Sequence, residues 1–353
     1  MLILAINPGS TSIKLSISED DREIRRMAVE FDPAELDRCN TKELAQEYRL
    51  KTVMAFLEGE NYKPEDFDCV VSRGGVIGNV KAGAYRINEA MLQYIADTPM
   101  RPHSIGVSIA YGLMEPLGRP AFIYDAVSAD EWEPMYKLTG IKGKYKPTFQ
   151  HTLNTRRVAF EMARRLGKDF NEINVLVSHL GGGIDATFFK HGRIVESLGY
   201  NDLGFSPERC GALFFDEVVK LTKEMTPEEL FAINHGKGGL NSLLGTTSVK
   251  EVEQRIDAGD KEAEMVLECM AHRVAQTLAC GAVDMCGDVD AIVLTGGIAN
   301  SKRFTEWIRE RVEFIAPVYI MAGEMELEAL TQGALRVMRG EEEAKEYVYL
   351  SKK

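Results

Sequence analysis

Residues 1–17 read MLILAINPGSTSIKLSI: an apolar run, a short polar turn around Gly9, and then apolar residues at every second position. The run at residues 2–6 is typical of a buried strand, and the alternation from Ile13 to Ile17 has the period of a strand rather than a helix. We therefore predict a hairpin. Gly9 permits backbone angles closed to other residues, and the hydroxyl residues after it stand beside exposed amides. Such a turn is suited to anionic oxygens.

Lys14 adds a cation just beyond this turn. A P-loop is excluded, because that loop needs glycine directly before its lysine, Ser or Thr directly after it, and a helix that begins there. Here Ile13 precedes the lysine and Leu15 follows it, and the period stays that of a strand. An ordinary tight hairpin with a serine-rich turn is the alternative to a phosphate site. The first turn by itself does not distinguish the phosphate site from the tight hairpin.

Length and charge limit the class of protein. The chain has 353 residues, and 45% of them are hydrophobic. This length exceeds that of most domains with a single hydrophobic core. We expect two domains, 1–150 and 151–326, with a helix at about 327–353 that packs back onto the first. The net charge of -12 disfavours nucleic acid and membrane surfaces as partners and favours small molecules. The apolar start is too short for a signal sequence or a membrane span.

The six cysteines show neither C-x-x-C spacing nor clustered histidines. Disulfide and metal frameworks built on cysteine are therefore not expected. A reducing cytoplasm is the predicted location.

Predicted helices and buried strands alternate along the chain, which is typical of an α/β fold. The segment 132–148 lacks clear periodicity and predicts a loop or crossover between the domains. The expected helices are 41–59, 104–117, 155–166, 250–281 and 327–337, and the expected strands after the first hairpin are 69–72, 121–124, 174–177 and 291–295.

The opening pattern returns in the second half. The apolar run 174–177 leads into LGGG at 180–183, and the following IDATFFKHGRIVES predicts strand, turn and strand. A third glycine turn, at residues 296–297, also follows a buried strand. Glycine in such turns often serves geometry alone, but three turns, two of them in matched hairpins, indicate nucleotide binding. Two related α/β domains facing each other across a cleft are expected.

This organisation resembles the actin, sugar kinase and heat-shock chaperone superfamily of ATPases, whose domains have a ribonuclease H-like fold. In that superfamily the two hairpins hold phosphates and the late glycine turn receives the adenosine. Sugar kinases and chaperones have Asp where this chain has Asn7. NPGSTSIK at 7–14 is instead similar to the N-x-G-S-S-S-x-K signature of the acetate and butyrate kinase family, which phosphorylates short carboxylates.

Other segments match that family in chain order. VSRGG contains Arg73, RPHSIG contains His103, FIYDAVSADEW contains Asp125, QHTLN contains His151, SHLGGGID contains His179, and FSPERCGAL contains Arg209. LTGGIANS at 294–301 is similar to the adenosine motif, and GEMELEAL at 323–330 to the acidic segment that supplies a metal ligand. The Asn that usually follows the family's histidine in RPHSIG is absent, with Ser104 and Ile105 in its place.

The resemblance implies roles for these residues and the cofactors ATP, ADP and Mg²⁺. Catalytic roles fall to Arg73, Asp125, His151 and Arg209. Substrate and phosphate binding falls to Asn7, Ser10, Ser12, Lys14, His103, His179, Gly181, Gly182 and Gly183. Nucleotide binding falls to Gly296, Gly297, Ile298 and Asn300. Glu326 and Asp125 are the predicted metal ligands, directly or through water, with Glu324 in reserve.

Each assignment has a structural alternative. Arg73 and Arg209 could pair with surface carboxylates, Asp125 could cap a helix, and the histidines could be core or loop residues. The four arginines of helix 155–166 are expected on an exposed face.

The length, VSRGG and FSPERCG resemble the shorter butyrate kinase branch, so we expect reversible formation of butanoyl phosphate and ADP from butanoate and ATP. The alternatives are an acetate or propionate kinase of the same family, or a non-catalytic nucleotide-binding protein. Family resemblance also implies a homodimer joined through the second domain.

Overall fold

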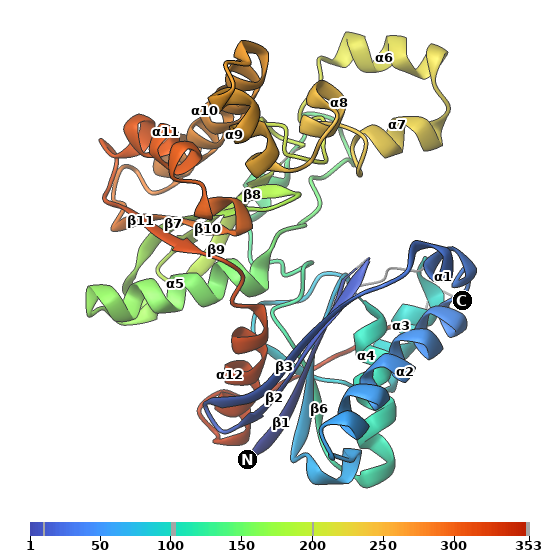
Figure 1. Ribbon diagram of the computed structural model, residues 1–353. Coiled ribbons are helices and arrows are strands. Elements are labelled where there is room, and N and C mark those ends of the chain that lie inside the picture. The colour runs from blue at the N-terminus through green and yellow to red at the C-terminus, as the bar shows by residue number, and fades with distance from the viewer. Residues whose placement is uncertain (10, 100–103, 200, 351–353) are drawn as a thin grey trace. The chain divides into compact units, whose positions relative to one another are not determined.

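The computed structural model describes residues 1–9, 11–99, 104–199 and 201–350 (Figure 1). The chain divides into two compact units: residues 1–130 together with 325–353, and residues 131–324. The division falls earlier than the predicted boundary near residue 151. The predicted site residues Ser10 and His103 lie outside the described residues.

The first unit contains a seven-stranded sheet of order β12-β5-β6-β4-β1-β2-β3. Its first hairpin is confirmed, because β1 pairs antiparallel with β2 and places Asn7 opposite Lys14. The strands are β1 (Leu2–Pro8), β2 (Ser12–Glu19), β3 (Arg22–Glu30), β4 (Cys69–Arg73), β5 (Ala84–Arg86), β6 (Ala121–Tyr124) and β12 (Lys345–Glu346).

Three neighbouring strands of this sheet, β1, β4 and β6, run parallel. Ile6 pairs with Ser72, and Arg73 pairs with Tyr124. The carboxyl ends of these strands therefore reach the same edge of the sheet, where ligands bind in open α/β folds.

Helices cover both faces of the sheet. Figure 1 shows α12 on one face and α2 with α4 on the other. Apolar residues on one face of the strands, among them Leu4, Leu15 and Ile123, form a buried core with α2, α3 and α4. The helices of this unit are α1 (Pro33–Arg38), α2 (Lys42–Gly59), α3 (Glu89–Asp97), α4 (Ile105–Met114) and α12 (Glu326–Met338).

The second unit contains a five-stranded sheet of order β11-β10-β7-β8-β9, and its hairpin β7–β8 repeats the opening theme. Helix α5 packs on one face and α10 on the other (Figure 1). The strands are β7 (Asn174–Leu180), β8 (Ile184–Lys190), β9 (Arg193–Gly199), β10 (Ala291–Gly296) and β11 (Val318–Ala322). The helices are α5 (Thr152–Leu166), α6 (Phe215–Glu224), α7 (Pro227–Ile233), α8 (Leu240–Leu244), α9 (Val249–Asp257), α10 (Lys261–Asp284) and α11 (Lys302–Val312).

Two expectations about elements are wrong. The predicted helical stretch 250–281 is two helices, because Gly259 adopts a φ of +94° and Asp260 then caps α10 by accepting hydrogen bonds from the N–H groups of Glu262 and Ala263. The arginines of α5 do not all face solvent. The Arg156 guanidinium lies over the Phe160 ring, 4.9 Å from its centroid, so its stem covers apolar surface.

Among the described residues, no helix has both the length and the apolar character needed to cross a bilayer.

Candidate active site

Two buried residues far apart in sequence meet in the first unit. Asn7, at the end of β1, donates a 2.5 Å hydrogen bond through Nδ2 to Oε2 of Glu326, the first residue of α12. Nη1 of Arg73, at the end of β4, lies 3.3 Å from Oε1 of the same carboxylate. Both members of the ion pair are almost fully buried. Removing either charge therefore leaves the other uncompensated in a poorly solvated place.

Asp125 follows β6 at the same edge of the sheet. It is buried, and its φ of +47° lies in the left-handed region that few non-glycine residues adopt. Its Oδ1 accepts a 2.7 Å hydrogen bond from the N–H of Gly83, and its own N–H donates to the Gly83 carbonyl. This exchange holds the strand end against the loop before β5. The structure thus brings three predicted residues, Asn7, Arg73 and Asp125, to the ends of adjacent strands.

The first turn is closed by a hydrogen bond from the N–H of Gly9 to the carbonyl of Ser12 at 2.8 Å. Lys14 and Ser12 are half-buried on β2. Of the two predicted metal residues in GEMELEAL, Glu326 is buried in the cluster with Asn7 and Arg73, whereas Glu324 is exposed and belongs to the second unit.

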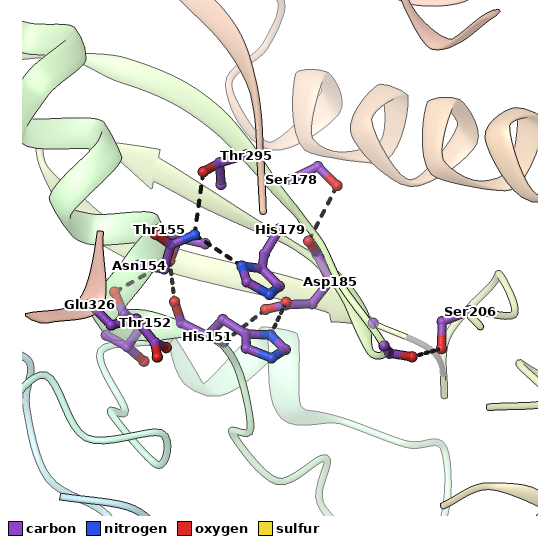
Figure 2. A network of polar contacts seen from close by, with 12 residues as sticks. His151, Thr152, Asn154, Thr155, Ser178, His179, Asp185, Ser206, Thr295 and Glu326 are labelled. Carbon is purple, nitrogen blue, oxygen red and sulfur yellow. Dashed lines mark hydrogen bonds and ion pairs between the residues drawn. The ribbon is translucent and has the colours of Figure 1, made fainter. Parts of the chain in front are cut away.

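In the second unit the two predicted histidines are stacked, with ring centroids 3.9 Å apart (Figure 2). His151 precedes α5 and His179 lies near the end of β7. Nδ1 of His151 lies 2.5 Å from Oδ1 of Asp185, and the His151 N–H donates to Oδ2 at 3.0 Å. Burial disfavours the charged form of Asp185, yet the adjacent His151 imidazole and these hydrogen bonds hold the pKa of Asp185 below its ordinary value.

His179 has a different set of partners. Nδ2 of Asn154 lies 2.9 Å from its Nδ1 and also donates to Oγ1 of Thr295 at 3.3 Å. The Thr295 hydroxyl in turn donates to the Gly323 carbonyl at 3.2 Å. Thr295 pairs with His179 across the parallel strands β10 and β7, so these contacts join neighbouring strand ends.

The guanidinium of Arg209 packs directly against the backbone of the second glycine turn, at Gly183. A Cβ built on Gly183 would lie 1.5 Å from Nη1 of Arg209, so any other residue would displace the guanidinium. The loop before Arg209 is tied to the same turn, since the Ser206 hydroxyl donates to the Gly182 carbonyl at 2.7 Å. The N–H of Glu208 donates to this carbonyl at 3.2 Å. These hydrogen bonds hold the loop that carries Arg209 against the second glycine turn.

The third glycine turn lies against the second. Gly296 has a φ of +89°, and a Cβ there would lie 2.4 Å from the Leu180 carbonyl oxygen. Gly297 and Asn300 are exposed, Ile298 is half-buried, and the Asn300 side chain donates to the Gly297 carbonyl at 2.9 Å. The predicted nucleotide residues thus stand beside the predicted phosphate turn.

Sequence reasoning missed Asp185, Asn154 and Thr295. All three stood inside quoted motifs, but Asp185 and Thr295 were read as strand residues, and Asn154, just before the predicted helix 155–166, was given no role. Asp185 carried a signal, because a carboxylate at the first inward position of a buried strand requires a buried partner.

The model of the acetokinase family matches residues 141–333, more than half of the chain. The chain belongs to the acetokinase family. Three solved structures are similar in fold. The acetate kinase of Porphyromonas gingivalis has a TM-score of 0.78 at 16% identity and covers 94% of this chain and 98% of its own. A propionate kinase from Francisella tularensis subsp. tularensis SCHU S4 has a TM-score of 0.75 at 18% identity, with coverages of 94% and 98%.

A putative N-acetylmannosamine kinase from Listeria monocytogenes has a TM-score of 0.53 at 14% identity and covers 96% of this chain and 100% of its own. The two-domain ATPase fold expected from the hairpins is therefore confirmed. Membership of the acetokinase family makes the protein an ATP-dependent kinase that phosphorylates a carboxylate.

The acetokinase family implies Mg²⁺, and the residues of the first unit fit it. Asn7 Oδ1 is buried and has no hydrogen-bond partner among the described residues, and it stands beside the Glu326 carboxylate. Mg²⁺ in proteins is usually coordinated by one or two such oxygen ligands and by several water molecules. Asn7 and Glu326 would therefore hold the ion directly or through water. When bound with ATP, Mg²⁺ neutralises charge on the phosphate oxygens.

Proposed function

We propose that this acetokinase family member is a butyrate kinase, which converts butanoate and ATP to butanoyl phosphate and ADP by direct in-line transfer. The motifs VSRGG and FSPERCG support this branch. The acetate and propionate kinases among the similar structures support the chemistry and leave acetate and propionate as competing substrates.

Phosphoryl transfer to a carboxylate is an electrostatic problem. The acceptor is already ionised at neutral pH, so no general base is needed. Negative charge must instead be stabilised on the transferring group while the reacting oxygens stay in line. In this proposal Arg73 neutralises the incoming carboxylate, and Arg209 with His151 holds the transferring phosphoryl.

The position of Arg209 is the observation that carries the proposal. Its guanidinium is packed on the glycine turn whose amides are suited to phosphate, and the turn has no Cβ that could displace it. A preorganised arginine beside a phosphate turn stabilises transition-state charge without reorganising during the reaction. A surface ion pair would not require this close approach.

A substrate panel tests the proposal. ADP release is measured with acetate, propionate, butyrate and isobutyrate, and hydroxylamine traps the acyl phosphate. We expect the highest kcat/KM for butyrate. One methylene changes the ratio only about 10–200-fold, so the four acids must be compared under one set of conditions. A clear preference for acetate or propionate would make the protein an acetate or propionate kinase instead. If no carboxylate stimulated ADP release, the kinase assignment would be overturned.

We also propose that the protein is a homodimer joined through α6 and α7. These helices have no buried residue, and Figure 1 shows them standing off the sheet of their own unit. Phe214 and Phe215 are 86% and 79% exposed, and Phe231 on α7 is 64% exposed. Such an apolar face on an amphipathic helix usually marks an interaction site.

Charge on α6 favours a second copy of the chain as the partner. Its first turn carries Asp216 and Glu217, and Lys220, which pairs with Glu217, is followed by Lys223 and by Glu224 at the end of the helix. Antiparallel packing about a two-fold axis brings Asp216 of each copy toward Lys223 of the other.

A further inference from the structure

The two stacked histidines of the second unit are held by different kinds of partner. His151 contacts an ionised carboxylate, and His179 contacts a side-chain amide (Figure 2). In a neutral imidazole one ring nitrogen donates and the other accepts, and the partner of one nitrogen fixes the role of both. The hydrogen-bond network therefore determines where each proton lies.

The proton on His151 follows from Asp185. An ionised carboxylate only accepts hydrogen bonds, so the 2.5 Å contact requires a proton on Nδ1 of His151. The second carboxylate oxygen accepts the His151 backbone N–H at 3.0 Å, which fixes the plane of the carboxylate as well. Nε2 is then the nitrogen at which His151 can gain or lose a proton without breaking the contact with Asp185.

The proton on His179 follows from a longer chain of contacts. The Thr295 hydroxyl donates to the Gly323 carbonyl, so its oxygen accepts from Asn154. That contact must come from the amide NH₂ of Asn154, which sets the orientation of the amide. The same NH₂ faces Nδ1 of His179 at 2.9 Å, which makes this nitrogen an acceptor.

His179 is accordingly neutral, with its proton on Nε2. That nitrogen lies beneath the second glycine turn, since a Cβ built on Gly181 would be 2.9 Å from it. His179 thus offers a fixed N–H donor to the turn without adding charge.

We propose that Asp185 and Asn154 are positioning residues that hold the two stacked imidazoles as opposite tautomers, with His151 protonated on Nδ1 and His179 on Nε2. The arrangement directs the exchangeable nitrogen of His151 away from Asp185 and makes His179 a permanent donor at the phosphate turn. This inference rests on the proposed function for its effect on turnover, but the tautomers themselves are independent of the substrate.

Long-range ¹H–¹⁵N spectra of ¹⁵N-histidine-labelled protein test the tautomers directly, with the two rings assigned from His151→Gln and His179→Gln. We expect a protonated Nδ1 in His151 and an unprotonated Nδ1 in His179. The same tautomer in both rings, or the reverse pair, would overturn the proposal. This result stands even if no carboxylate proves to be a substrate.

Asp185→Asn tests the positioning role, because an amide can donate to Nδ1 and reverse the tautomer. We expect the His151 pattern to change and kcat to fall about 10²–10⁴-fold, with KM for ATP changed less than about threefold. Because Asp185 acts through His151, the double variant Asp185→Asn/His151→Gln should be no slower than His151→Gln alone. Additive losses, or an unchanged His151 tautomer, would contradict the proposal.

Two further variants separate this effect from damage to the strand. Thr187 lies on the same face of β8, and its buried hydroxyl has no partner among the described residues, so Thr187→Val should leave spectra and turnover unchanged. Asn154→Asp places a carboxylate at Nδ1 of His179 and should protonate that nitrogen while His151 keeps its tautomer. Failure of Asn154→Asp to alter His179 would contradict the second half of the proposal.

Discussion

Asn7 and Glu326, 319 positions apart in the chain, share a 2.5 Å hydrogen bond that joins the end of the first strand to the start of the last long helix. Arg73 completes the cluster through the other oxygen of Glu326. The first turn is thereby linked to a carboxylate that also balances a buried cation.

Asn7→Asp places a second carboxylate against Glu326. We expect the free energy of unfolding at pH 8 to fall by about 2–4 kcal/mol, because two buried carboxylates then share one arginine. Turnover falls as well. Urea denaturation at pH 8 and pH 5 provides the measurement, and the loss should shrink at pH 5 as one carboxyl takes up a proton. Equal losses at both values would show that charge repulsion is not the cause.

Arg209→Ala should lower kcat about 10³-fold or more with the fold intact, since it removes a preorganised cation from the phosphate turn. Arg164→Ala is the matched control, because Arg164 is exposed on α5 and pairs with Glu161. That control should keep normal turnover. Normal turnover in Arg209→Ala would remove this residue from the catalytic machinery.

Gly183→Ala should reduce kcat through Arg209, because the added Cβ occupies the place of the guanidinium. Combining Gly183→Ala with Arg209→Ala should cost little more than Arg209→Ala alone. Steady-state kinetics of the single and double variants measure this coupling. Independent, multiplicative losses would place the effect of Gly183 elsewhere.

Acid should destabilise the protein partly through Asp185. Its folded pKa lies below the ordinary value of 3.8, so its contribution to stability is fully present above the unfolded value and is lost as the pH falls through the folded value. Urea midpoints from pH 5 downward are compared between wild type and Asp185→Asn. The wild type should lose stability more steeply below about pH 4. Parallel curves would contradict the lowered pKa.

The homodimer proposal predicts that Phe215→Glu is monomeric by light scattering while its circular dichroism stays unchanged. Burying the new carboxylate against a second α6 costs several kcal/mol. Phe314→Glu is the control, since Phe314 is 81% exposed and follows α11 in the same unit, and Figure 1 shows α11 apart from α6. A monomeric wild type, or a dimeric Phe215→Glu, would rule out this interface.

Local patterns predicted the elements that carry the site. The hairpins β1–β2 and β7–β8 were visible because their buried runs are followed by glycine turns and strand alternation. Strand β3 was missed because its residues are mostly exposed, so apolar alternation is weak. The cap at Asp260 that splits the predicted helix was present in the sequence as Gly259–Asp260.

Partners within the site could be predicted only in part. The family resemblance predicted roles for Arg209 and His151, but the packing of Arg209 on Gly183 depends on the path of the loop that carries Arg209. The last helix was expected to pack on the first domain, but the contact between Asn7 and Glu326 depends on where the first residue of α12 meets the end of β1, which no local pattern determines. Asp185 was read as an ordinary strand residue. Alternation predicts which face of the sheet its side chain lies on, but not that His151 lies against that face.

Formation of an acyl phosphate tests the central claim most directly. ³¹P NMR follows ATP, Mg²⁺ and butyrate with the wild-type protein and with Arg209→Ala. We predict that the wild type forms ADP and butanoyl phosphate in equal amounts and that Arg209→Ala forms neither at a comparable rate. Unchanged ATP, or its hydrolysis to free phosphate with no acyl phosphate detected, would contradict the account.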